Sequence, residues 1–456
     1  MFKKIATIID NFSPGLQKII RNIGWLMIEK VFAMIVNFSI VIYLVRYLGV
    51  ENFGKLSYCI SFVALFEAIT KLGLNGIVVR NLVREPEAKN TILGTAFILK
   101  VLGSIVACSL VIISSAKFNY NQELHTINMI LAWGLIFTAF DNIDYWFESQ
   151  VNSKAISLIR SIQLVITSAL KLLFIWLNFS LIAFAWLIFG DYLLKAVLKI
   201  WIYSQYRFSI FSWKFDFARA QLVLRDSFPL ILSSVMITIY MKIDQVMLGN
   251  MTNSVAVGNY ATAVKFSEIW YFFPVAICGS CFPAIIRVRK ESLKKYHAKL
   301  QQLYDLMVAI AVGIAIPTTF LAKPLLTYLL GTEYAKAGII LSWHIWAGVF
   351  VFLGVARSKW LMIENLTIFN FATTSLGALT NVVLNLWLIP LYQGVGAAIA
   401  TIISYAVATY LSCIFYTPMR QTGLMLTKSL LIIFRWRQNL IYLNQIRKVF
   451  KNKSLR

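Results

Sequence analysis

The sequence predicts an all-α polytopic membrane protein, and three observations lead to this fold class. Hydrophobic residues make up 59% of the 456 residues and charged residues only 14%, and the mean hydropathy is +0.73, well above that of a soluble domain. Twelve segments are apolar over roughly 20 residues, the length that crosses a bilayer. Several of them carry charged residues near their middle, which predicts a polar interior between the helices.

The twelve segments follow one another with short connections. Each is expected to be an α-helix, because a backbone polar group left unpaired in hydrocarbon is costly. They are predicted at about 22–48, 54–76, 91–116, 127–148, 156–178, 181–203, 228–249, 257–286, 303–322, 338–362, 367–389 and 394–417. The expected organisation is a cytoplasmic N-terminal segment, a six-helix bundle, a cytoplasmic linker, a second six-helix bundle and a basic cytoplasmic tail, at 1–21, 22–203, 204–227, 228–417 and 418–456 respectively.

The distribution of Lys and Arg predicts the orientation of the helices. The net charge is +24, and alternate connections hold clusters of basic residues, such as those at 287–299. Positive residues favour the cytoplasmic side of short loops. Both termini are therefore expected in the cytoplasm, with an even number of spans in the cytoplasmic (inner) membrane. The charge indicates topology and an attraction to anionic lipids rather than nucleic-acid binding. The connections expected outside hold few cations: Arg46, Lys55, Lys117, Lys323 and Lys336.

The chain repeats itself about halfway. Residues 43–62 resemble residues 244–266: in each, a span ends in Leu-Gly, a short polar connection follows, and a Gly (Gly54, Gly258) begins the next span. Because an even number of spans separates the copies, they would share one orientation, as in a parallel repeat with the transport path between two halves. A chance likeness of two Gly-containing hairpins is the other interpretation.

Sequence signatures of enzymes are absent. The chain has no H-E-x-x-H, no P-loop and no nucleophile elbow. We therefore expect a transporter without catalytic residues, metal ligands or a bound cofactor. Without a Walker motif, ATP is not the direct energy source, so coupling to H⁺ or Na⁺, the membrane potential or the pull of the substrate stays open.

Ionisable residues inside the spans are the main candidates for a functional site. A charge at the bilayer centre costs at least about 2.5–3.5 kcal/mol, so it is expected to face a cavity or a partner. Lys100 and Lys171 have no acid within four residues, so their partner must come from another helix, water or substrate. Lys71 and Lys199 lie near span ends and are expected to extend to the membrane surface. Three pairs have helical spacing and suit either a structural ion pair or a lumen: Glu67 with Lys71, Asp191 with Lys195, and Lys265 with Glu268.

Two spans have a continuous polar face. In the seventh, Ser233, Tyr240 and Asp244 lie within about 40° of one another on a helix, which predicts water on that side. In the fourth, three acids at i, i+3 and i+7 form a stripe that suits proton exchange or pairing with the basic cytoplasmic loops: Asp141, Asp144 and Glu148.

Five segments carry a family resemblance, in the family's order and over about 22–417. They are NIGWLMIEKVFAMIVNFSIVIYLVRYLGVENFGKLSY, KLGLNGIVVRNLVREP, SFPLILSSVMITIYMKIDQVMLG, VGNYATAVKFSEIWYFFPVA and NVVLNLWLIPLYQGVGAAIAT. The sequence resembles the Wzx-type flippases of O-antigen and other lipid-linked oligosaccharides, in the polysaccharide transporter family of the MOP exporter superfamily. The tail after residue 418 departs from the family core.

The resemblance implies a MATE-like fold, with two six-helix bundles in a V around a central lumen. It also implies a flippase that moves polyprenyl-pyrophosphate-linked oligosaccharide repeat units from the inner to the outer leaflet by alternating access, for cell-surface polysaccharide such as lipopolysaccharide. The positions that match the family's pattern are Glu29, Lys30, Arg46, Arg80, Arg84, Asp141, Asp144, Tyr240, Asp244 and Glu268.

Two sets of residues are predicted to act on such a substrate. Cations expected to form a lumen surface that meets the pyrophosphate are Lys30, Arg46, Arg80, Lys100, Lys171, Lys242 and Lys265. Residues expected at gating or coupling contacts are Glu29, Asp141, Asp144, Tyr240, Asp244 and Glu268.

Other functions remain as alternatives. A MATE-like cation or drug antiporter would need acids without cationic neighbours, whereas the unpaired lysines favour an anionic lipid head. A lipid II flippase is the nearer alternative, although such proteins commonly have fourteen spans. A membrane scaffold or polymerase subunit is disfavoured by the buried charges. Expected partners are the lipid-linked oligosaccharide, anionic lipids and a polysaccharide polymerase complex, with no nucleic acid and a monomeric transport unit.

The C-terminal tail contains an apolar run, LMLTKSLLIIF at 424–434, followed by basic residues. The run is too short to span the bilayer, so a helix lying on the inner leaflet is expected. A disordered basic end is the alternative.

Overall fold

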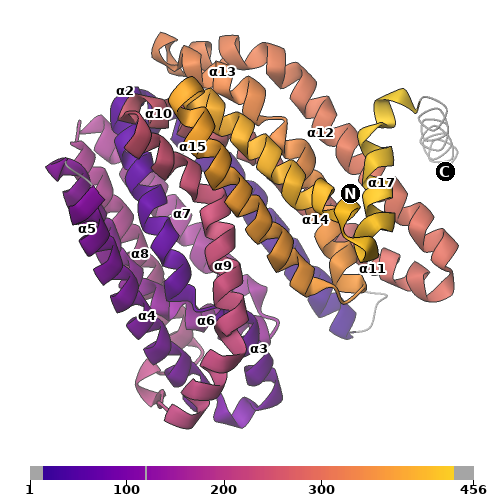
Figure 1. The fold of residues 1–456 in the computed structure, drawn as a ribbon. Coiled ribbons are helices and arrows are strands. Elements are labelled where there is room, and N and C mark those ends of the chain that lie inside the picture. The colour runs from indigo at the N-terminus through magenta and orange to yellow at the C-terminus, as the bar shows by residue number, and fades with distance from the viewer. Residues whose placement is uncertain (1–13, 119–120, 436–456) are drawn as a thin grey trace, which may run out of the picture. The chain divides into compact units, whose positions relative to one another are not determined.

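The computed structural model describes residues 14–118 and 121–435, and its regular elements are all helices. The chain forms two compact units, one ending at Gly258 (unit 1) and one beginning at Asn259 (unit 2). The predicted all-α fold is confirmed. Figure 1 shows long helices running beside one another in each unit.

Unit 1 is built around α2, which packs along α4, α7 and α9, while α5 packs against α8. α9 lies in the predicted second bundle yet packs with unit 1, and the predicted division into six-helix halves stays a prediction. The elements are α2 (Pro14–Lys71), α3 (Leu74–Arg84), α4 (Lys89–Phe118), α5 (Gln122–Gly134), the 3₁₀-helix η2 (Leu135–Asp141), α6 (Asn142–Ser149), α7 (Ser153–Trp176), α8 (Leu181–Gln205) and α9 (Phe217–Met251).

Unit 2 combines straight, bent and broken helices. α12 packs along α13 and α14, and α15 packs along α13, α14 and the π-helix η6. The elements are α10 (Ser254–Glu268, which begins in unit 1), α11 (Phe272–Glu291), α12 (Leu293–Leu330), α13 (Ala335–His344), α14 (Ala347–Ile363), α15 (Thr367–Ala406), η6 (Val407–Leu411), α16 (Ser412–Phe415) and α17 (Arg420–Leu430).

Eight helical stretches in the described residues are long and apolar enough to cross a membrane, or ten if each of two bent pairs is one span. One stretch, Ile28–Arg84, has 57 residues; as one helix it would be about 85 Å long, against about 30 Å of hydrocarbon. Backbone breaks interrupt the two longest stretches, at Gly49 (φ 69°) in α2 and at Gln393 (φ 49°) in α15. If each bent pair is one span and each of these two interrupted stretches is two spans, the total is twelve. The number of spans stays a prediction.

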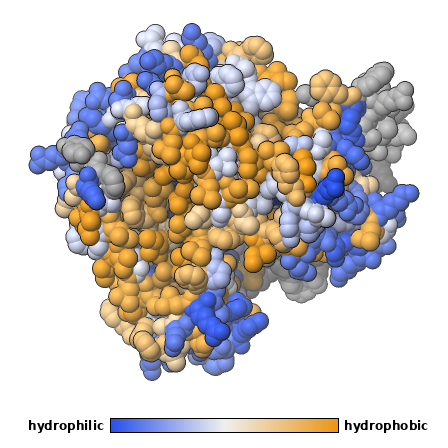
Figure 2. Space-filling model, viewed as in Figure 1, coloured by the Kyte–Doolittle hydropathy of each residue, from blue (hydrophilic) through white to orange (hydrophobic). Residues whose placement is uncertain are grey.

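The surface of unit 1 fits a lipid environment. On the face drawn in Figure 2, hydrophobic residues cover the middle of the region of α4, α5 and α8, and hydrophilic residues gather toward its two ends. Apolar side chains such as Leu102 and Ile113 of α4 are 54% and 66% exposed. Hydrocarbon, rather than water, would cover them at little cost. The protein is thus a multi-pass membrane protein.

The two glycines of the sequence repeat lie at one close helix contact. A Cβ on Gly54 would lie 1.8 Å from Ser254 O, and a Cβ on Gly258 would lie 1.9 Å from Val50 O. Gly258 follows Gly54 by the same number of residues as Ser254 follows Val50, so the two contacts are reciprocal.

The tail helix α17 is packed against unit 2. Its side chains Met425, Leu426 and Ser429 are buried, and Ser429 Oγ donates to Asp305 Oδ1 of α12 at 2.6 Å. Arg435 Nη1 lies 3.3 Å from the same oxygen. The segment is helical over Arg420–Leu430 with one face buried against protein, and its position on the inner leaflet stays a prediction. The basic residues from Arg437 onward lie outside the described residues.

Candidate functional site

A polar cavity of about 630 Å³ lies inside unit 1. Side chains from α2, α6, α7, α8 and α9 line it, with the end of η2 and the start of α3. A cavity of this size is in the usual range for a ligand site. Its charged lining residues are Glu67, Lys71, Asp141, Asp144, Glu148, Arg160, Lys195 and Lys199.

Two buried lysines contact the carboxylates of Asp141 and Asp144, which line this cavity. Lys199 Nζ lies 2.5 Å from Asp141 Oδ1 and 3.1 Å from Asp144 Oδ2. Lys100 Nζ lies 3.6 Å from Asp141 Oδ2 and 3.5 Å from the Tyr145 hydroxyl. The side chain of Lys100 is 0% exposed and that of Lys199 is 7% exposed. Asp141 therefore holds two cations from two different helices.

The local backbone explains why these groups meet. Asp141 ends η2, and Asp144 lies in the first turn of α6. A 3₁₀-helix winds 120° per residue rather than 100°, so η2 turns the acidic stripe relative to α5. On α8, Lys195 and Lys199 stand one and two turns after Asp191, on one face of the helix.

Further ion pairs lie in or beside the lining of this cavity. Arg160 Nη2 lies 4.0 Å from Asp144 Oδ2, and Lys71 Nζ lies 3.0 Å from Glu67 Oε1. Lys195 Nζ lies 2.9 Å from Asp191 Oδ2, and Gln163 donates to the other oxygen of Asp191.

The cations and acids of this network balance in number. A set of five cations (Lys71, Lys100, Arg160, Lys195 and Lys199) faces a set of five acids (Glu67, Asp141, Asp144, Glu148 and Asp191). Lys100, Lys199 and Asp144 are the most buried of these charges, and a buried charge is costly unless it is paired. An anion that enters must therefore compete with carboxylates for the lysines.

Of the residues predicted from the sequence, Lys100, Asp141 and Asp144 come together here. The prediction that Lys199 extends to the membrane surface is wrong, because its ammonium is buried between two carboxylates. The sequence carried a signal for it, since Asp191, Lys195 and Lys199 form an i, i+4, i+8 stripe. Arg160 and Gln163 of α7 were not singled out, and only the fold brings them to the cavity.

The other predicted cations lie outside the described lining of this cavity. Arg80 of α3 pairs with Asp226 of α9 at 2.8 Å, with both side chains about half exposed. Lys30 and Arg46 of α2 are exposed, and Lys171 and Lys242 are half-buried. Their predicted roles, and that of Lys265 in α10, stay predictions.

The remaining gating candidates lie on α2, α9 and α10. Glu29 is half-buried, and its Oε2 has no hydrogen-bond partner among the described residues. Asp244 is 4% exposed, next to Gln245, whose Oε1 accepts a hydrogen bond from Ser61 at 2.8 Å. Tyr240 and Glu268 are half-buried. The gating roles stay predictions.

The fold is that of the MOP transporter superfamily. An inward-facing multidrug resistance MATE transporter matches 89% of this chain and 99% of its own, with a TM-score of 0.66 and 13% identity. The lipid II flippase MurJ in an inward closed conformation matches 94% of this chain and 99% of its own, with a TM-score of 0.63 and 14% identity. At such identities the likeness establishes the fold alone.

Sequence comparison identifies the family. The capsular polysaccharide biosynthesis protein CapF of Staphylococcus aureus is 21% identical over 403 residues, which cover 87% of this chain and 99% of that protein. The family model described as polysaccharide biosynthesis protein matches residues 19–289, more than half of the chain. The chain therefore belongs to the polysaccharide biosynthesis protein family.

Proposed function

We propose that this protein is a flippase, which moves polyprenyl-pyrophosphate-linked oligosaccharide from the inner to the outer leaflet by alternating access for the synthesis of surface polysaccharide. Membership of a polysaccharide biosynthesis family supports the sugar-carrying substrate. A transporter fold shared with a lipid II flippase supports movement across the membrane rather than catalysis. The proposed location is the cytoplasmic membrane, with both termini in the cytoplasm.

The observation that carries the proposal is the position of Lys199 between Asp141 and Asp144 inside the cavity. A pyrophosphate is a dense anion that lysine and arginine hold by charge-assisted hydrogen bonds. Lys199, Lys100 and Arg160 converge on one region and could turn from their carboxylates to the phosphates. The cavity offers such a head group a charged site inside unit 1.

The charge balance also bears on energy coupling. When the pyrophosphate takes cations from Asp141 and Asp144, these carboxylates are left without partners in a poorly solvated site, which is costly. Uptake of H⁺ or Na⁺ by the two carboxylates would compensate. We therefore propose that ion coupling, if the protein uses it, takes place at Asp141 and Asp144, the carboxylates that give up their cations to the substrate head.

The rival cation antiporter fits this cavity less well. A cationic drug would have to approach Lys100 and Lys199, whose buried ammonium groups repel it, while their acids are already occupied. A lipid II flippase would carry a head group of the same chemistry, so the cavity favours lipid pyrophosphates as a class. A complex with a polysaccharide polymerase remains a prediction.

Deletion of the gene in its host tests the proposal. Lipid-linked oligosaccharide should accumulate, as measured by mass spectrometry of lipid extracts, and surface polysaccharide should fall. Re-expression of the wild-type chain should reverse both effects. Normal surface polysaccharide together with increased sensitivity to cationic drugs would overturn the proposal in favour of the antiporter.

A further inference from the structure

The two acids that hold Lys199 differ in the other cations they contact. Asp144 contacts Lys199 at 3.1 Å and Arg160 at 4.0 Å, and both of these cations line the charged cavity. Asp141 contacts Lys199 and, at 3.6 Å, Lys100. The Lys100 side chain is 0% exposed and does not belong to the described lining of the cavity. A ligand in the cavity therefore reaches both cations of Asp144 but only one cation of Asp141.

Lys100 is fixed in its enclosed position. Its Nζ lies 3.5 Å from the Tyr145 hydroxyl and 5.2 Å from the centre of the Tyr145 ring, where the face of the ring attracts a cation. Of the cations that converge on these acids, Lys100 is therefore the last that a ligand can draw away. Asp141 keeps a cation when Lys199 turns toward a ligand, whereas Asp144 does not.

The two acids also differ in their contact with solvent. The side chain of Asp141 is 33% exposed and that of Asp144 is 16% exposed. Asp144 Oδ1 is buried, and it has no hydrogen-bond partner within the described part of the chain. A buried polar oxygen without a partner is costly. Once its cations turn to a ligand, Asp144 is thus the acid that neither a fixed cation nor much water stabilises.

We propose that binding of the pyrophosphate head group is linked to the uptake of one proton, which Asp144 accepts while Lys100 keeps Asp141 ionised. This linkage rests on the proposed function and narrows its coupling site from two carboxylates to one. The proton comes from water in the cavity and adds to a carboxylate oxygen of Asp144. It returns to water when the head group leaves and Lys199 and Arg160 contact Asp144 again. A proton on Asp144 removes the repulsion between the carboxylate and the phosphates, since two close anions do not both stay ionised without cost.

The groups around Asp144 favour a proton over a metal cation. Its ionisable neighbours are Lys199 of α8, Arg160 of α7, Lys100 of α4, Asp141 of η2, and Tyr145 and Glu148 of its own helix α6. Further ionisable residues that line the cavity are Glu67, Lys71 and Lys195. A hard metal cation needs several oxygen ligands, and the cations beside Asp144 repel it. A proton needs a single oxygen.

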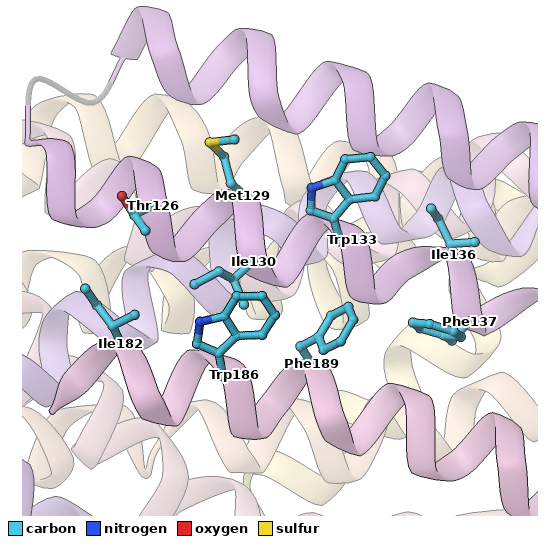
Figure 3. Close-up of a pocket in the computed structure, with 9 residues that line it drawn as sticks. All are labelled: Thr126, Met129, Ile130, Trp133, Ile136, Phe137, Ile182, Trp186 and Phe189. Carbon is cyan, nitrogen blue, oxygen red and sulfur yellow. The ribbon is translucent and has the colours of Figure 1, made fainter. Parts of the chain in front are cut away.

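The proton reaches Asp144 through the charged cavity and not from the other side of α8. A second cavity, of about 470 Å³, lies between α5 and α8, and none of the lining residues drawn in Figure 3 is ionisable. Apart from the indole N–H groups of Trp133 and Trp186 and the Thr126 hydroxyl, its lining side chains are apolar. Apolar cavities stay dry, so no chain of water leads through it. Head group and proton therefore enter by the same cavity.

Isothermal titration calorimetry of the purified full-length protein with inorganic pyrophosphate tests the inference. Titrations at neutral pH in two buffers with different heats of ionisation count the protons taken up per ligand bound. The ligand's own change of protonation cancels when variants are compared. We expect the wild type to take up about one proton more than Asp144→Asn. Equal proton counts for these two proteins would overturn the inference.

A charge-balanced double variant is the matched comparison. Lys100→Met with Asp141→Asn removes one charge of each sign and leaves Asp144 with both of its cations, so its proton count should equal that of the wild type. Glu364→Gln should also match the wild type, since Glu364 pairs with Arg289 and neither residue lines the cavity. Loss of proton uptake in the double variant would overturn the assignment to Asp144. Lys100→Met alone should take up more protons than the wild type, because the ligand then draws away the last cation of Asp141. An unchanged count would overturn the role of Lys100.

The pH dependence of the affinity gives a second readout. Because binding takes up a proton, the affinity of the wild type relative to Asp144→Asn should rise as the pH falls, by up to about tenfold per pH unit. A ratio that depends on sodium instead of pH, with choline as the replacement ion, would overturn the inference. Flipping by a protein whose ratio does not change with pH would refute the inference and leave the proposed function standing. Proton-linked binding by a protein that does not flip lipid-linked oligosaccharide in proteoliposomes would refute the proposed function alone.

Discussion

Lys199 Nζ lies 2.5 Å from Asp141 Oδ1. No acid lies within four residues of Lys199, and no cation lies within four residues of Asp141, so neither has another ion-pair partner nearby in the sequence. Lys199 comes from α8 and Asp141 from the end of η2, so the fold alone creates this contact. Lys100 Nζ contacts the other carboxylate oxygen of Asp141, at 3.6 Å from Oδ2. A carboxylate that contacts two buried ammonium groups holds both in place.

Lys199→Met should abolish flipping. The change removes a cation from between Asp141 and Asp144 and leaves buried negative charge, which typically costs about 3–5 kcal/mol of folding stability.

The protein level should therefore fall as well, and the double variant Lys199→Met with Asp144→Asn separates the loss of flipping from the loss of stability. It removes one charge of each sign and keeps the Lys100–Asp141 pair. We expect near-normal levels by immunoblot with flipping reduced about 10- to 100-fold, as for a lost charge-assisted hydrogen bond.

The matched control is Lys290→Gln, an exposed lysine of α11, which should flip normally. If the double variant were abundant and fully active, the buried network would be structural and the cavity would not hold the head group.

Asp144→Asn should strengthen the binding of inorganic pyrophosphate. Asp144 contacts Lys199 at 3.1 Å and Arg160 at 4.0 Å, so its neutralisation removes one carboxylate that competes with the ligand for these two cations. Isothermal titration calorimetry on purified protein measures the affinity. Glu364→Gln serves as control, since Glu364 pairs with Arg289 and neither residue lines the cavity. Weaker binding by Asp144→Asn, or an equal gain in the control, would contradict competition between substrate and carboxylate.

The sequence predicted the fold well because hydropathy alone reports helices that lie in lipid. It also singled out Lys100, Asp141 and Asp144 correctly as charges that need a partner. It could not predict that Lys100 and Lys199 share Asp141, because that contact depends on the 3₁₀ winding of η2 and on the packing of α8. It also missed Arg160, whose partner lies sixteen residues earlier on another helix. Pairing between helices depends on tertiary geometry, which the hydrophobic pattern does not encode.

Gly54→Ala should destabilise the protein. The new Cβ would lie 1.8 Å from Ser254 O, so α2 and the start of α10 must separate. Overpacking of this kind typically costs about 1–3 kcal/mol. The melting temperature in detergent should fall, while Gly279→Ala, which meets no atom within 4 Å, should leave it unchanged or raise it. Equal melting temperatures for the two variants would show that the helices do not approach this closely.

Truncation after residue 419 should lower the protein level far more than truncation after residue 435. The shorter chain loses α17 and with it Ser429 and Arg435, both partners of Asp305, whose side chain is 1% exposed. The longer chain keeps these contacts and loses only residues 436–456. Fluorescence size-exclusion chromatography of tagged proteins measures the amount of folded protein, and flipping is then normalised to that amount. We expect normal flipping per molecule in the longer chain.

Equal levels of the two truncated proteins would mean that the packing of α17 on α12 contributes little to stability. An abundant but inactive longer chain would place the basic residues after 435 in the transport mechanism.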